Sequence, residues 1–318
     1  VTERTFNSLE IDVNQVTHYN QISYRSPDSL HRITLGYRLN YWAYGDQLLF
    51  SPRAQYAFYP RWKHNTIFKL AGGIYSQPPF YRELRNRAGD INPDVRAQDS
   101  WHIIGSVDHV FSLWGRPFKF LTEAYYKGGN NIIPYEVDNV QIRYFGENSA
   151  RAFAYGVDFR LNGQFIKGAE SWFSLGLLST KEDIAGDGQG FIRRPSNQVV
   201  NLGIYFEDHL PNDPSWRIYL NLLFGSGLPI GPPGNDELRS AFIGDEYYRT
   251  DIGVSKVIRF TGSDSYFSSI SIRAEILNAF AADNTISYNW IETLSGSQFA
   301  IPNALSARFP NLKVIARF

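Results

Sequence analysis

Residues 30–42 read LHRITLGYRLNYW, and every second side chain from Ile33 onward is apolar or aromatic. The side chains between them, such as Arg32 and Arg38, are polar or small. Successive side chains of a strand point to opposite faces, so a period of two predicts a strand with one apolar face. The run is also longer than the roughly five or six residues of an average strand in a soluble protein.

The same alternation recurs at 198–207, 216–224 and 270–276. Such runs extend for about 10 to 14 residues, long enough for a strand tilted by about 45° to cross a bilayer. Aromatic residues stand at the run ends: Tyr41, Trp42 and Tyr44; Tyr56, Phe58, Tyr59 and Trp62; Trp114, Trp172, Trp216, Tyr247 and Tyr248. A soluble β-sandwich with an aromatic core would alternate as well. Run length and aromatic placement favour an all-β fold, a transmembrane antiparallel β-barrel with interfacial girdles.

The composition excludes several classes of protein. The 318 residues include 31 Lys and Arg against 31 Asp and Glu, and they include no Cys and no Met. A net charge of zero argues against nucleic acid as a partner, because such binding relies on cationic contacts to phosphates. The absence of Cys removes disulfides and thiolate chemistry. No stretch approaches the roughly 20 consecutive apolar residues that a membrane helix needs.

The spacing of the connections also predicts a barrel. Short turns are expected at 60–64, 113–117, 163–169, 209–215 and 261–265, and longer polar loops at about 75–98, 129–148, 181–197, 225–246 and 280–310. Strict alternation of short and long connections is typical of outer-membrane barrels, which have short periplasmic turns and long outer loops. The final run, 311–318, ends on Phe318, which we expect to act as the assembly signal. With further strands at 30–43, at 14–25 and within 2–12, the count is about 13 or 14 strands.

Several segments together resemble a known family. They are LAGGIYSQPPFYREL (70–84), RPFKF (116–120), IPYEVDNV (133–140), IRY (142–144), GVDFR (156–160), FGSGLP (224–229), RTDIG (249–253), EILN (275–278), NTISY (284–288) and LKVIARF (312–318). In this order and spacing, the chain from about Arg32 to its end resembles the carboxy-terminal barrel of TonB-dependent outer-membrane receptors of the Bacteroidota type.

The resemblance implies a domain plan and a set of partners. Such receptors are barrels of about 22 strands that are plugged by a separate N-terminal domain. About eight strands and the plug domain would therefore lie outside this chain. Residues 1–318 would then be the C-terminal part of a single outer-membrane β-barrel domain. The implied location is the bacterial cell outer membrane. The implied partners are outer-membrane lipid and lipopolysaccharide, the protein's own N-terminal plug domain, the TonB complex, and a surface lipoprotein or larger outer-membrane complex.

The loop from Gln77 to Gln98 is the main candidate for a substrate site. Its candidate residues are Tyr81, Arg82, Glu83, Arg85, Arg87 and Arg96. Arg pairs with carboxylates and phosphates and stacks on aromatic rings, so the loop could contact an anionic substrate or lipopolysaccharide. The alternative is that these arginines pack against their own neighbours. Pro78 and Pro79, which stiffen the exit from the strand, favour that alternative.

A second group of candidates lies on the minor, polar faces of the strands. These residues are Arg32, Arg38, Arg217, Arg273 and Glu275. We expect them to face the lumen and to pair with one another or with the plug.

No pattern of residues indicates chemistry at a cofactor, a metal or a nucleophile. The six His residues lack metal-site spacing, and the adjacent Asp108 and His109 would face opposite sides of a strand. Residues 186–190 (GDGQG) lack the Lys-Ser/Thr of a phosphate-binding loop. The acidic residues Glu182, Asp183 and Asp187 lack EF-hand spacing. We therefore expect no enzyme activity, no metal and no cofactor.

The leading functional hypothesis is TonB-dependent active transport across the outer membrane. The chain would supply the barrel wall and the extracellular loops of a receptor for a nutrient such as a glycan, a peptide or an iron chelate. The rival is a receptor-like structural barrel subunit of an outer-membrane assembly or secretion complex, without transport of its own. A passive porin is the third reading.

Overall fold

One large antiparallel sheet dominates the computed structural model, which describes residues 13–62, 65–210, 212–260, 266–305 and 307–318. The sheet has 14 strands. No helix among the described residues is long and apolar enough to cross a membrane. The predicted strand within 2–12 lies outside the described residues.

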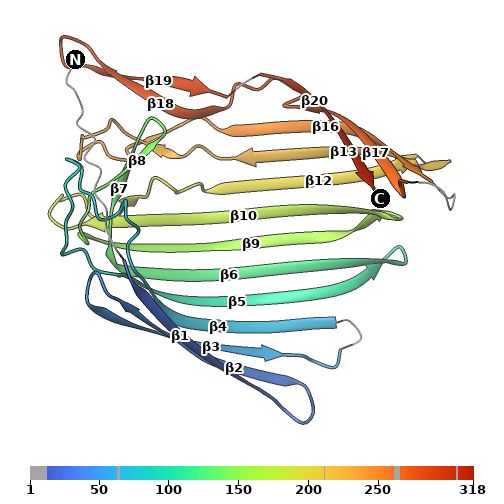
Figure 1. Ribbon diagram of the computed structural model, residues 1–318, viewed down its shortest axis with the longest axis horizontal. Coiled ribbons are helices and arrows are strands. Elements are labelled where there is room, and N and C mark those ends of the chain that lie inside the picture. Colours follow the sequence, from blue (N-terminus) through green and yellow to red (C-terminus); the bar gives the residue numbers. More distant parts are fainter. Residues whose placement is uncertain (1–12, 63–64, 211, 261–265, 306) are drawn as a thin grey trace.

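All but one of these strands form a meander in which each strand pairs with the next. In spatial order they are β1 (Gln15–Arg25), β2 (His31–Trp42), β3 (Gln47–Phe58), β4 (Asn65–Gln77), β5 (Gln98–Leu113), β6 (Arg116–Ile132), β9 (Ala150–Ile166), β10 (Ala169–Ile184), β12 (Val200–Leu210), β13 (Asp213–Gly225), β16 (Tyr247–Arg259), β17 (Ser269–Leu277) and β20 (Phe309–Arg317). The remaining strand, β11 (Ile192–Arg193), pairs with β10. Figure 1 shows the long strands lying alongside one another in this order.

Three small hairpins lie outside this sheet. They are β7 (Tyr135–Asp138) with β8 (Gln141–Tyr144), β14 (Pro229–Ile230) with β15 (Phe242–Ile243), and β18 (Thr285–Glu292) with β19 (Gln298–Ala304). Each belongs to a long connection between two strands of the large sheet. In Figure 1 the β7–β8 and β18–β19 hairpins lie toward the left end of the molecule.

Short turns join the strands at the right end of Figure 1. Trp114 and Gly115, with φ of 53° and 70°, form a two-residue turn that pairs Leu113 with Arg116. Two successive positive φ values are typical of the type I′ turn, whose twist matches that of the flanking strands. The turns predicted at 113–117 and 163–169 are confirmed, and the other three include residues outside the described ranges.

Long connections gather at the opposite end of the sheet. They span residues 78–97, 133–149, 185–199, 226–246 and 278–308, and we call them the outer loops. These ranges agree closely with the predicted long loops. Upstream of the predicted connections, which begin at residue 60, residues 43–46 join β2 to β3 at this same end by a tight turn. There the Asp46 N–H donates to the Ala43 carbonyl at 3.2 Å.

The two faces of the sheet differ as the alternation predicts. Ile218, Ile272 and Ile33 are 47%, 39% and 43% exposed, whereas Tyr219 is 7% exposed. Large apolar side chains are exposed on most strands, far beyond what a protein surface in water carries. This apolar face is the one that lipid covers in a transmembrane barrel. We call the opposite side of the sheet, which carries Arg217 and Tyr219, the polar face.

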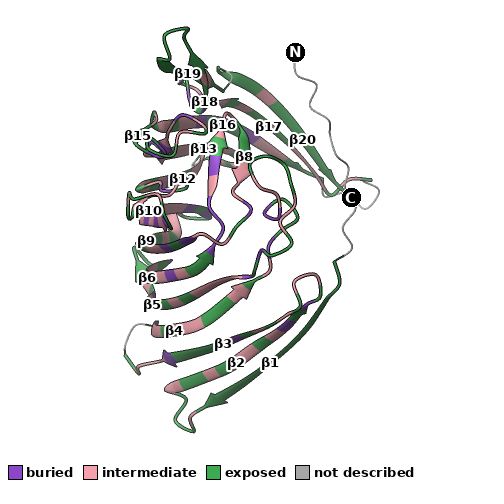
Figure 2. Cartoon of the chain, turned by 90° about the vertical axis from the view of Figure 1, so that its left-hand side faces the viewer, coloured by how far each residue is buried: buried purple, intermediate pink, exposed green. Residues whose placement is uncertain are grey.

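The sheet curves into an arc that is open on one side, as Figure 2 shows. The edges of the arc are β1 and β20, which are not paired with each other in the described residues. An unpaired edge in lipid leaves backbone donors and acceptors unsatisfied at a cost of several kcal/mol each. In a membrane-spanning form of this sheet both edges must therefore be paired.

Tightly packed apolar residues lie at the outer end of the sheet. Trp42, Leu84, Val95 and Ile133 are each at most 2% exposed and form one cluster. The Trp42 ring folds over Gly45, where a Cβ atom would lie 2.1 Å from it. The assignment of Trp42 to an interfacial girdle is therefore wrong, since its ring anchors the outer loops instead.

Candidate functional site

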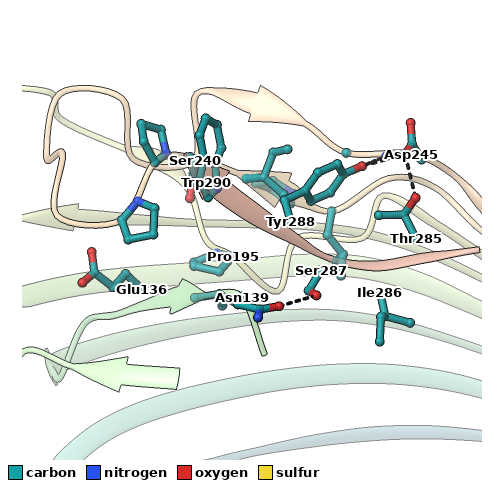
Figure 3. Close-up of a pocket in the computed structure, with 18 of the residues that line it drawn as sticks. Glu136, Asn139, Pro195, Ser240, Asp245, Thr285, Ile286, Ser287, Tyr288 and Trp290 are labelled. Carbon is teal, nitrogen blue, oxygen red and sulfur yellow. Dashed lines mark hydrogen bonds between the residues drawn. The ribbon is translucent and has the colours of Figure 1, made fainter. Parts of the chain in front are cut away.

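Four of the outer loops line a partly open cavity of about 320 Å³. Figure 3 shows its lining residues, which come from the β7–β8 hairpin, the 185–199 loop, the 226–246 loop and β18. The walls are largely apolar and include Val137, Leu228, Ile230, Ile286 and Trp290 together with Pro195, Pro229, Pro232 and Pro233. A largely apolar cleft or cavity with a few convergent polar groups is the usual form of a small-molecule site.

Polar side chains tie the loops of this cavity together. Asp245 accepts hydrogen bonds from the Tyr288 hydroxyl at 2.9 Å and the Thr285 hydroxyl at 2.8 Å. The Ser287 hydroxyl donates to Asn139 Oδ1 at 2.6 Å, across 148 residues of sequence. Burial raises the pKa of the Tyr288 hydroxyl, so the group stays protonated and able to donate. The cavity is thus built by contacts between loops that are distant in the chain.

Glu136 contributes a carboxylate to the same cavity. It is 9% exposed, and its Oε2 accepts a hydrogen bond from the Gly234 N–H at 3.1 Å. Its side chain forms no ion pair with any described residue. Together with Asp245 it places two carboxylates on the cavity wall.

A buried ionic cluster lies at the border of the cavity. Glu182 is 0% exposed and accepts hydrogen bonds from Arg194 Nε at 2.9 Å and from Arg239 Nη2. Arg239 Nη2 also donates to the Tyr135 carbonyl at 3.1 Å. Both carboxylate oxygens of Glu182 are thus engaged by arginines. Asp183, one residue later, pairs with Arg151 at 2.7 Å.

The residues predicted as a substrate site in the 78–97 loop fall into two groups. Glu83, Arg85 and Arg87 bond within or between the outer loops, whereas Tyr81, Arg82 and Arg96 keep exposed side chains. Glu83 is buried and accepts hydrogen bonds from the Phe80 N–H at 2.7 Å and from Gln98 Nε2 at 3.0 Å. Burial raises the pKa of the Glu83 carboxyl, and these two hydrogen bonds partly oppose the rise. Arg85 Nη1 donates to the Gly89 carbonyl at 3.2 Å within the loop.

Arg87 ties this loop to another. Its Nη2 lies 2.7 Å from Asp236 Oδ1 in the 226–246 loop, and its guanidinium carbon lies 3.6 Å from the centre of the Phe145 ring. Tyr81 and Arg82 contact each other, with Arg82 Nε donating to the tyrosine hydroxyl at 3.1 Å. None of the six predicted residues lines the cavity.

The backbone of Arg96 is hydrogen-bonded to the Asn148 side chain, while the Arg96 side chain is exposed. Its N–H donates to Asn148 Oδ1 at 2.6 Å, and its carbonyl accepts from Asn148 Nδ2 at 2.9 Å. Tyr81, Arg82 and Arg96 therefore keep exposed side chains at the outer end of the sheet.

Three of the predicted polar-face residues come together in one network. Arg217 Nη1 pairs with Glu207 Oε1 at 2.6 Å. Glu207 also accepts a hydrogen bond from the Tyr205 hydroxyl at 2.7 Å, and the Tyr205 ring stacks on that of Tyr219. Glu275 accepts hydrogen bonds from the Tyr219 hydroxyl and from Asn311 Nδ2, and the Arg273 guanidinium carbon lies 4.9 Å from the centre of the Tyr219 ring. These side chains join β12, β13, β17 and β20.

The two remaining polar-face candidates lie on β2, away from that network. Arg32 Nη2 donates weakly to Ser23 Oγ at 3.5 Å, and Arg38 is paired in register with Tyr19 and Ser51. Phe318, the predicted assembly signal, follows β20 and is 78% exposed.

The cavity residues were not predicted from the sequence. Glu136 and Tyr288 stand in segments 133–140 and 284–288, which carry part of the family resemblance, but no local spacing relates one to the other. Only the pairing of strands and the packing of loops bring them to one wall.

Solved structures with the same architecture are outer-membrane transporters and receptors. The transporter YddB of Escherichia coli matches with a TM-score of 0.63 and 13% identity, over 95% of this chain and 45% of that one. The ferric enterobactin receptor of Pseudomonas aeruginosa matches with a TM-score of 0.66 and 12% identity, over 96% and 45%. The RagAB peptide transporter matches with a TM-score of 0.59 and 10% identity, over 86% and 45%.

No protein-family model and no curated protein matches the sequence. The chain spans less than half the length of the solved structures just described. At these identities the similarity establishes the fold, and the fold explains the exposed apolar face. The chain therefore has the fold of outer-membrane β-barrels and forms a curved wall of such a barrel with the loops at one end.

Proposed function

We propose that this chain forms the wall and the outer loops of a TonB-dependent transporter in the bacterial outer membrane. The observation that carries the proposal is the largely apolar cavity beneath the outer loops, at the end of a sheet whose fold resembles that of outer-membrane transporters. A nutrient would bind among these loops. The polar face, with its network around Tyr219 and Glu275, would line the lumen and contact a plug domain.

The partners follow from this role. A plug would close the lumen, the TonB complex would supply energy from the inner membrane, and lipopolysaccharide would surround the outer rim. A surface lipoprotein could cover the outer loops. Exposed Tyr81, Arg82 and Arg96 are the groups available to such outer contacts. The Bacteroidota-type resemblance and the nutrient classes of glycan, peptide and iron chelate belong to this proposal.

Uptake by cells tests the proposal directly. Cells carrying the complete gene would be supplied with labelled glycans, peptides and iron chelates, in the presence and absence of TonB. We expect accumulation of one class that stops when TonB is deleted or the proton gradient is collapsed. Uptake that persists without TonB would indicate a porin. A barrel that assembles without any uptake and purifies with other membrane proteins would indicate a structural subunit.

A further inference from the structure

We propose that the cavity beneath the outer loops binds an organic cation, an ammonium or guanidinium group carried on an apolar body, with Glu136 as its counter-ion. This inference deepens the proposed function, because it names the ligand chemistry of the site where a nutrient would bind. It rests on the charges, the exposure and the walls of the cavity.

The Glu136 carboxylate has room for one further partner. Its Oε2 accepts the Gly234 N–H at 3.1 Å, while Oε1 accepts no hydrogen bond from a described residue. The residue lines the cavity, as Figure 3 shows. Glu136 is only 9% exposed, and a buried carboxylate is costly unless a cation or donors compensate its charge. A ligand cation would supply that compensation.

The walls suit the rest of such a ligand. Trp290 and Tyr288 present aromatic rings, which attract cations over their faces within about 6 Å. Leu228, Ile230 and Ile286 add apolar surface for a hydrocarbon or aromatic body. Figure 3 shows Glu136 and Asp245 at opposite ends of this lining. A ligand whose cation pairs with Glu136 could therefore place a hydrogen-bond donor at its other end near the Asp245 carboxylate.

Arg239 raises the opposite possibility of an anionic ligand, and its surroundings argue against it. Among the described residues it is the one cationic side chain of the lining, and it is hydrogen-bonded to the buried Glu182, which also pairs with Arg194. Its Nε and Nη1 have no hydrogen-bond partner, but each exposes less than 1 Å². A ligand-sized anion cannot reach them without rearrangement of the loops. Two carboxylates, Glu136 and Asp245, line the cavity against this single arginine.

Binding of matched small probes to the complete purified protein in detergent tests the inference. The probes are 2-phenylethylammonium, 2-phenylethylguanidinium, neutral 2-phenylethanol and anionic phenylacetate, each titrated by calorimetry. We expect one or both cations to bind and the alcohol and the anion to bind at least about tenfold more weakly, because a hydrogen bond to a charged group is the stronger kind. The two cations distinguish an ammonium ligand from a guanidinium ligand.

Two variants locate the binding. E136Q keeps the acceptor for the Gly234 N–H and removes the charge, so we expect it to weaken cation binding by about tenfold or more. E246Q neutralises an exposed carboxylate that does not line the cavity and should leave binding unchanged. Protease resistance of the outer loops would verify that both variants are folded.

Three results would overturn the inference: tighter binding of phenylacetate, equal binding of the alcohol and the cations, or unchanged cation binding in E136Q. Absence of saturable cation binding to folded protein would also overturn it. This assay requires neither TonB nor energy. Cation binding without any uptake would therefore contradict only the transport function. Uptake of an anionic nutrient would contradict only the cation site.

Discussion

Glu182 of β10 and Arg239 of the 226–246 loop form a buried ion pair across 57 residues of sequence. Arg194 approaches the other carboxylate oxygen at 2.9 Å, so one glutamate holds two arginines from two outer loops. The Glu182 side chain is 0% exposed and that of Arg239 is 5% exposed. The cluster therefore fastens the outer loops to the end of the sheet.

Removal of the Glu182 charge should loosen these loops. Breaking a buried ion pair from one side costs about 3–5 kcal/mol, because the partner charge remains buried and uncompensated. We expect E182Q to accelerate protease cleavage within 226–246, measured by mass spectrometry of the fragments. The neighbouring D183N removes a pair whose Arg151 partner is 65% exposed and should cost less than about 1 kcal/mol. Equal cleavage of the two variants would contradict the role assigned to Glu182.

The contact between Trp42 and Gly45 predicts a second effect. A Cβ atom at position 45 would lie 2.1 Å from the Trp42 ring, so G45A must displace that ring from the cluster with Leu84 and Ile133. Overpacking of this kind typically costs about 1–3 kcal/mol. We expect a changed near-ultraviolet circular dichroism signal and faster cleavage of the 78–97 loop. G105A is the control, since nothing lies within 4 Å of its added Cβ.

The apolar face predicts a third effect. Leu220 lies midway along β13 on that face and is 37% exposed. An Arg on the lipid side of a barrel costs about 2–4 kcal/mol near the bilayer midplane. We expect L220R to lower the free energy of unfolding in lipid vesicles, measured by urea titration of the complete protein. S106R is the control, because Ser106 lies on the polar face opposite Glu123 in register. If L220R were tolerated as well as S106R, the assignment of the faces would be wrong.

The raised pKa of Glu83 predicts a dependence on pH. The folded loop holds this carboxyl protonated to a higher pH than the unfolded chain, in which the pKa is about 4.3. The folded state then binds the extra proton between the two pKa values, so local stability falls as pH rises through that window. Cleavage of the 78–97 loop should become faster from about pH 4 upward. The amide of E83Q cannot titrate, so this variant should lose the pH-dependent part of the loop's stability. Comparison of the cleavage rates of wild type and E83Q across pH would show this loss.

Local features account for most of the fold that the sequence predicted. Alternation of apolar and polar residues within one run decides which side chains of a strand share a face, as Ile218 and Tyr219 illustrate. Turn positions such as Trp114 and Gly115 follow from residues adjacent in the chain. The errors arose where a distant segment changed the environment. Trp42 ends an alternating run, but contacts with Leu84, Val95 and Ile133 bury it.

The candidate site was predictable only in part for the same reason. Arginines of the 78–97 loop were recognised by their type, yet the partner of Arg87 lies 149 residues away. Glu83 was grouped with them as a ligand contact, whereas its hydrogen bonds serve the loop itself. Whether Tyr81, Arg82 and Arg96 meet a substrate stays a prediction.

The sequence by itself determined that this chain forms long amphipathic strands, where they turn, and which face meets lipid, because these properties depend on neighbours one to four residues away. The tertiary structure alone decided that Glu136, Asp245 and Tyr288 share one cavity and that Glu182 fastens two loops. Those relationships depend on strand register and loop packing. Contacts between segments so far apart leave no periodic signal in the chain.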